Sequence, residues 1–131
     1  MPECVCLKNG NGLGLFLEER SNSKGEPMLA VELSSYGCEH WYLPLSEVRR
    51  LIQAMTDRES EVRVRSAKPG SRYSLNLTRG RSWGVHTTNC VYNMCTADVS
   101  IVGSFLLRLV FKAGMPEKEL RKLYKALFKS I

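Results

Sequence analysis

The chain has 131 residues, of which 44% are hydrophobic and 24% charged, and its formal net charge is +6. This length predicts one domain with a sizeable core, and the longest near-apolar run, Ile101–Val110, is too short and too polar to span a bilayer. No basic region precedes an apolar one at the N-terminus, and five cysteines cannot all pair, so we expect reduced thiols and an intracellular protein without membrane attachment.

The first half predicts four short strands followed by a helix. We expect Ser46 to cap that helix, because a serine oxygen satisfies free backbone N–H groups there. The apolar residues of the helix recur at one-face spacing: Val48, Leu51, Ile52 and Met55. The four strand segments are rich in apolar residues and separated by turns containing Asn, Gly, Ser or Pro: Cys4–Lys8, Leu13–Glu19, Met28–Leu33 and Cys38–Leu43.

The second half repeats this order with less regular patterns. The β-branched and aromatic content of Asp98–Lys112 predicts a strand with an irregularity at Gly103, and a helix begins near Pro116. A basic, flexible loop over Arg79–Gly84 contains Trp83. The other segments expected to be extended are Glu61–Ser66, the stretch from Tyr73 to Leu77, and Val85–Cys95.

The sequence therefore predicts an α+β fold built from antiparallel sheets and two amphipathic helices, in the order ββββα-ββββα. We expect residues 1–131 to form one domain made of two such halves, 1–59 and 60–131. The halves share this order of elements without evident sequence identity.

Part of the first half resembles a known family. The segments Leu15–Glu19, Asn22–Gly25, Met28–Val31 and Trp41–Pro44, followed by the apolar stripe of the helix, are similar to the PUR repeat and, more loosely, to the PC4 and Whirly group. This resemblance covers about residues 13–56. It implies a curved antiparallel sheet, backed by helices, whose open face holds single-stranded nucleic acid. The positions that match the contact residues are Lys24, Trp41 and Tyr42, although this half is net acidic.

The net positive charge lies in the second half. Residues 1–59 carry six Lys/Arg and nine Asp/Glu, whereas residues 60–131 carry thirteen Lys/Arg and four Asp/Glu. A basic face of this kind is typical of nucleic-acid binding, and exposed aromatic rings can stack on bases. We therefore expect binding of single-stranded DNA or RNA with low sequence specificity. The expected contact residues are Lys24, Trp41, Arg63, Arg65, Lys68, Arg72, Arg79, Arg81 and Trp83.

Several alternatives remain open. The basic half is also compatible with a protein–protein interaction module that binds an acidic partner or forms a homodimer through sheet edges, with no role in nucleic-acid binding. The lysines of the last helix, Lys118, Lys122, Lys125 and Lys129, are compatible with a merely solvated face.

Catalytic and metal-binding signatures are weak. No pair of cysteines has the Cys-x-x-Cys spacing of a zinc site, and no nucleophile elbow, phosphate loop or paired acids stand out. We therefore expect neither enzymatic activity nor a bound metal or cofactor.

Overall fold

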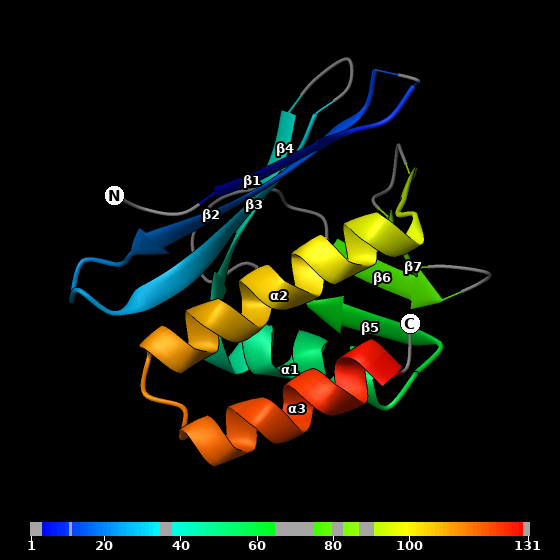
Figure 1. Ribbon diagram of the computed structural model, residues 1–131. Coiled ribbons are helices and arrows are strands. Elements are labelled where there is room, and N and C mark those ends of the chain that lie inside the picture. The colour runs from blue at the N-terminus through cyan, green and yellow to red at the C-terminus, as the bar shows by residue number, and fades with distance from the viewer. Residues whose placement is uncertain are drawn as a thin grey trace.

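The computed structural model of this protein describes residues 4–10, 12–34, 38–64, 75–79, 83–86 and 91–129. Within these residues the chain forms two four-stranded antiparallel sheets and three helices (Figure 1). The α+β prediction and the ββββα-ββββα order are confirmed, with one helix more than expected at the C-terminal end.

The first sheet is a meander in which each strand pairs with the next in sequence. Asn22 shapes the β2–β3 turn, since its Oδ1 accepts hydrogen bonds of 2.9 Å from the backbone N–H groups of Lys24 and Glu26. Gly25 has a φ of 81° in this turn, a conformation that glycine adopts without steric cost. The strands are β1 (Cys4–Lys8), β2 (Gly14–Ser21), β3 (Pro27–Ser34) and β4 (Cys38–Pro44).

The second sheet is a shorter meander in the order β5-β6-β7-β8. Its strands are β5 (Glu61–Val64), β6 (Leu75–Arg79), β7 (Trp83–His86) and β8 (Val91–Asn93). Trp83 thus begins a strand, and the prediction that it lies in a flexible loop is wrong.

The helices cover one face of the sheets. Helix α1 (Leu45–Thr56) follows β4 directly, so its N-cap is Pro44 and not the predicted Ser46. Helix α2 (Thr96–Lys112) packs against β1 and α1, and α3 (Glu117–Lys129) packs against α1 and α2. In Figure 1 the helices lie together below the first sheet. We call the sheet face toward the helices the inner face and the opposite one the outer face.

The prediction of a strand over Asp98–Lys112 is wrong, because this segment belongs to helix α2. Val and Phe favour strands only weakly, and packing overrides that preference here. The helix is apolar around much of its circumference since it lies between β1, α1 and α3. Its buried residues are Val99, Val102, Gly103, Phe105, Leu106, Leu107, Leu109 and Val110.

Gly103 brings α3 close to α2. A Cβ atom at this position would lie 2.7 Å from Cδ2 of Leu127, the most buried side chain of α3. The strand irregularity predicted at Gly103 is therefore wrong: the helix continues through this residue, whose missing side chain allows the close approach of α3.

The apolar core joins both halves of the chain. Buried residues of both sheets and all three helices form one continuous cluster, from Leu7 to Leu127. Among the described residues, no helix is long and apolar enough to cross a membrane.

Candidate functional site

Aromatic side chains gather on the outer face of the first sheet. The strand register places Phe16, Glu32 and His40 opposite one another on β2, β3 and β4. The adjacent row of this face contains Glu18, Ala30 and Tyr42. Side chains alternate between the two faces of a strand, so these residues point away from the helices.

These side chains line a depression of about 330 Å³. Its rings come from Phe16, His40 and Tyr42, and the His40 and Tyr42 rings meet edge to face with centroids 5.5 Å apart. Its charged groups are Glu18, Glu32 and Arg20. A hollow that combines rings with a few polar groups is suited to a flat ligand with a polar edge.

Cations lie at both ends of this outer face. Arg20 contacts Glu18 at 3.2 Å, and both side chains are substantially exposed. Lys24, also exposed, lies in the turn that follows β2. Lys8 is exposed at the opposite end of the sheet, where it pairs with Gly14. Positive charge therefore flanks the rings, whereas the two carboxylates lie among them.

The outer face of the second sheet is polar. Arg63 Nε donates a hydrogen bond of 3.1 Å to Asn76 Oδ1, and Thr78 Oγ1 lies 2.6 Å from His86 Nε2. A Cβ on Gly84 would come within 2.9 Å of Asn93 Oδ1, so the Asn93 side chain extends over this glycine. In the described part of this face, polar side chains bond to one another across the strands.

The predicted contact cations of the second half do not share one face where the structure describes them. Arg63 is exposed on the outer face, where it is 3.9 Å from Glu61. Arg79 shares the face of the buried residues Leu75 and Leu77, and its Nε atom is buried without a hydrogen-bond partner among the described residues. Four further predicted contact residues lie outside the described residues: Arg65, Lys68, Arg72 and Arg81.

Neither tryptophan can stack on a base, which corrects the prediction for both. Trp41 is 0% exposed and Trp83 is 7% exposed. Both rings face the core: Trp41 is opposite Val31 in the register, and Trp83 is opposite Arg79. Of the predicted contact residues that the structure describes, Lys24 and Arg63 are the exposed ones.

The sequence prediction missed the outward rings of Phe16 and His40, and it assigned base stacking to Trp41, whose ring is buried. Strand alternation contains the missing signal. If Leu15 and Leu17 face the core, then Phe16 between them faces outward, and the buried pair Trp41 and Leu43 leaves Tyr42 outward.

Helix α3 presents a second cationic surface. Its five cations are all exposed: Lys118, Arg121, Lys122, Lys125 and Lys129. Arg121 is 2.7 Å from Glu117. Beside this stripe the rings of Tyr124 and Phe128 stack with centroids 4.4 Å apart, and Tyr124 is 47% exposed.

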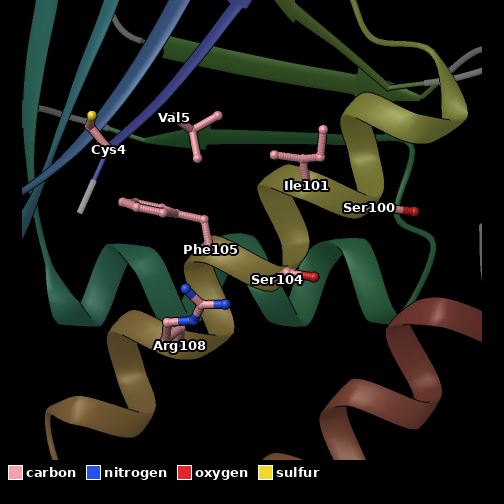
Figure 2. A pocket seen from close by; sticks show the side chains of 7 residues that line it. All are labelled: Cys4, Val5, Ser100, Ile101, Ser104, Phe105 and Arg108. Atoms are coloured by element: carbon pink, nitrogen blue, oxygen red, sulfur yellow. The ribbon is translucent and has the colours of Figure 1, made fainter.

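A larger hollow of about 540 Å³ lies between β1 and α2 (Figure 2). Val5, Ile101 and Phe105 supply its apolar surface, whereas Ser100 and Ser104 supply hydroxyl groups. It contains one aromatic ring, and its charged side chain, Arg108, already makes other contacts. Its chemistry does not indicate a particular class of ligand.

Comparison with known proteins adds no relative: no family model, curated protein or solved structure matches this chain. Among the described residues, no three His, Cys, Asp or Glu side chains lie close enough together to hold a metal ion. The outer face of the first sheet is therefore the candidate site, on its geometry alone.

Proposed function

We propose that this protein binds single-stranded nucleic acid, with bases lying on the outer face of the first sheet. The observation that carries this proposal is the depression in which Phe16, His40 and Tyr42 gather on an uncovered sheet face. Each base that stacks on an aromatic side chain contributes about 1–3 kcal/mol, whatever its sequence. Duplex DNA hides its base faces, so such a surface favours single strands.

Charge plays the smaller part at this face. Arg20, Lys24 and Lys8 can contact phosphates at its two ends, but Glu18 and Glu32 between them repel phosphates. The salt dependence of binding should accordingly be shallower than that of a purely basic surface. The exposed cations of α3 add long-range attraction that speeds association.

Fluorescence anisotropy with a labelled mixed-sequence single strand, as DNA and as RNA, and with the matching duplex tests this proposal. We expect binding to the single strands in preference to the duplex. In the double variant Phe16→Leu/Tyr42→Leu, affinity should fall by about tenfold to a hundredfold, because up to two stacking contacts are lost. Tyr124→Leu removes an exposed ring on α3 and serves as the matched control, with affinity unchanged.

Two results would contradict the proposal. One is the absence of binding even at low salt. A basic peptide would then be the next ligand to test, because the depression contains carboxylates. The other is binding that Arg63→Gln weakens and the ring variants leave intact, which would move the interface to the second sheet.

A further inference from the structure

Glu32 lies between two rings on the candidate site. On β3 it is opposite Phe16 of β2 on one side and His40 of β4 on the other, in a row that continues to Cys6 on β1. Opposite residues of antiparallel strands have Cβ atoms about 4.5–5.5 Å apart, so its carboxylate is next to both rings. Glu32 is half-buried in the wall of the depression.

The second carboxylate of this face is in a different situation. Glu18 is 3.2 Å from Arg20, which engages one of its oxygens. No described residue forms a hydrogen bond or ion pair with Glu32. A ligand that enters the depression therefore meets an acceptor-only group at Glu32 and a partly neutralised one at Glu18.

We propose that Glu32 selects bases that carry an exocyclic amino group and discriminates against uracil and thymine. This inference rests on the proposed function, since it concerns the bases that would stack on Phe16 and His40. A base stacked on either ring brings one edge over the Glu32 carboxylate. When the group on C4 lies over the carboxylate, cytosine offers its N4 amino donor, whereas uracil places its O4 acceptor there, which repels a carboxylate.

Cytosine and uracil give the cleanest comparison, because they have the same size and differ chiefly in the donor and acceptor groups of this edge. The experiment measures the affinity of the full chain for short oligo(dC) and oligo(dU) at slightly alkaline pH, where cytosine N3 is unprotonated. We expect the native chain to bind oligo(dC) about tenfold more tightly than oligo(dU), since a good base contact discriminates to this degree.

Glu32→Gln keeps the shape of the side chain but offers both a donor and an acceptor. The oligo(dC) preference should therefore fall to near unity, chiefly through tighter binding of oligo(dU). Glu18→Gln is the matched control: it removes the same charge one row away, so both affinities should rise together while their ratio stays at the native value. Circular dichroism verifies that each variant keeps the native fold.

The outcomes separate this inference from the proposed function. Equal affinity of the native chain for the two oligonucleotides would overturn the role of Glu32 and leave single-strand binding intact. An equal loss of preference in both glutamine variants would also overturn it, because charge and not a base contact would then be responsible. Failure to bind either oligonucleotide would overturn the proposed function and this inference together.

Discussion

The two sheets are alike on their inner faces and different on their outer faces. In the first sheet a row of inward residues ends at Trp41 on β4, and in the second the corresponding row ends at Tyr92 on β8. Both rings are almost fully buried, at 0% and 1% exposure, and each lies four residues before the first residue of a helix. The same positions of the two halves are therefore buried where they form the core.

The likeness continues into the helices that follow. Each buried residue of the junction and helix α1 lies 51 positions before a buried counterpart at the same point of α2. The pairs are Trp41/Tyr92, Leu43/Met94, Val48/Val99, Leu51/Val102, Ile52/Gly103, Ala54/Phe105 and Met55/Leu106. The two halves thus share a packing pattern that their sequences conceal, because the residue types differ at most of these pairs.

On the outer faces the corresponding positions have diverged. Tyr42, just after Trp41, is replaced by Asn93 after Tyr92. The first sheet leaves rings open to a ligand, whereas in the second Thr78 bonds to His86 and Arg63 to Asn76. A face whose polar groups already bond to one another gains less from a ligand. The outer face of the first sheet therefore has rings and polar groups available to a ligand, whereas the described polar side chains of the second sheet largely satisfy one another.

We expect the largest change in stability when substitutions on the two faces of strand β4 are compared. We expect Trp41→Ala to lower the free energy of unfolding by about 3–5 kcal/mol, because it leaves a cavity in the core. Its neighbour Tyr42→Ala should cost less than about 1 kcal/mol, since that side chain lies on the half-exposed outer face. Denaturant unfolding measures both values. Similar losses in the two variants would mean that β4 does not divide core from surface in this way.

The alternation of side chains along strands also determined how much of the fold and of the candidate site could be predicted from the sequence. The four strands of the first half and helix α1 were predictable within a few residues, because apolar periodicity and turn residues agree there. The outward rings were not identified, since two adjacent aromatics, Trp41 and Tyr42, leave the inward one ambiguous until Leu43 is placed in the core.

Helix α2 shows the other limit. A helix buried on several sides lacks the polar face that reveals helical periodicity, and its Val and Phe residues suggest a strand. The length of the segment nevertheless argued for a helix, because its fifteen residues exceed the usual strand length of about 3–10 residues. The orientation of the charged residues depends on strand bounds and register, which local patterns do not specify, so the sequence did not show that Arg63 and Arg79 lie on opposite faces of the second sheet.

Two glycine variants test the difference between the outer faces of the two sheets. In Gly84→Ala the new Cβ would come within 3.1 Å of His86 Nε2, which disturbs the hydrogen bond to Thr78 and should cost about 1 kcal/mol. In Gly14→Ala the tight contact of the Cβ would be with the Phe16 ring, at 3.0 Å, and this ring can move outward; the Leu7 backbone oxygen, at 3.7 Å, would be an ordinary contact. We expect the unfolding free energy to stay within about 0.5 kcal/mol of the native value in that variant.

Binding should respond in the opposite way. Gly14→Ala displaces a ring of the proposed site and should weaken single-strand binding, whereas Gly84→Ala should leave it unchanged. Denaturant unfolding and anisotropy on the same two variants test both statements. Weaker binding in Gly84→Ala would show that the second sheet takes part in the interface.

The last and smallest effect concerns Tyr92, the inward ring of the second sheet. Its hydroxyl group can ionise, whereas its counterpart in the first sheet, Trp41, has no ionisable group. Burial, followed by the nearby Asp98, Cys95 and Cys6, raises the pKa of Tyr92 above its ordinary value of 10.0. The unfolded chain therefore ionises this tyrosine at lower pH than the folded chain does. The stabilisation that results is fully present below about pH 10 and is lost as the pH rises through the folded pKa.

Tyr92→Phe removes the ionisable group and should flatten this part of the stability profile. The measurement is denaturant unfolding of both proteins between about pH 8 and about pH 11, where the difference between them cancels the other titrating groups. Parallel profiles would show that the Tyr92 hydroxyl is solvated, and that the likeness of the two inner faces ends before β8.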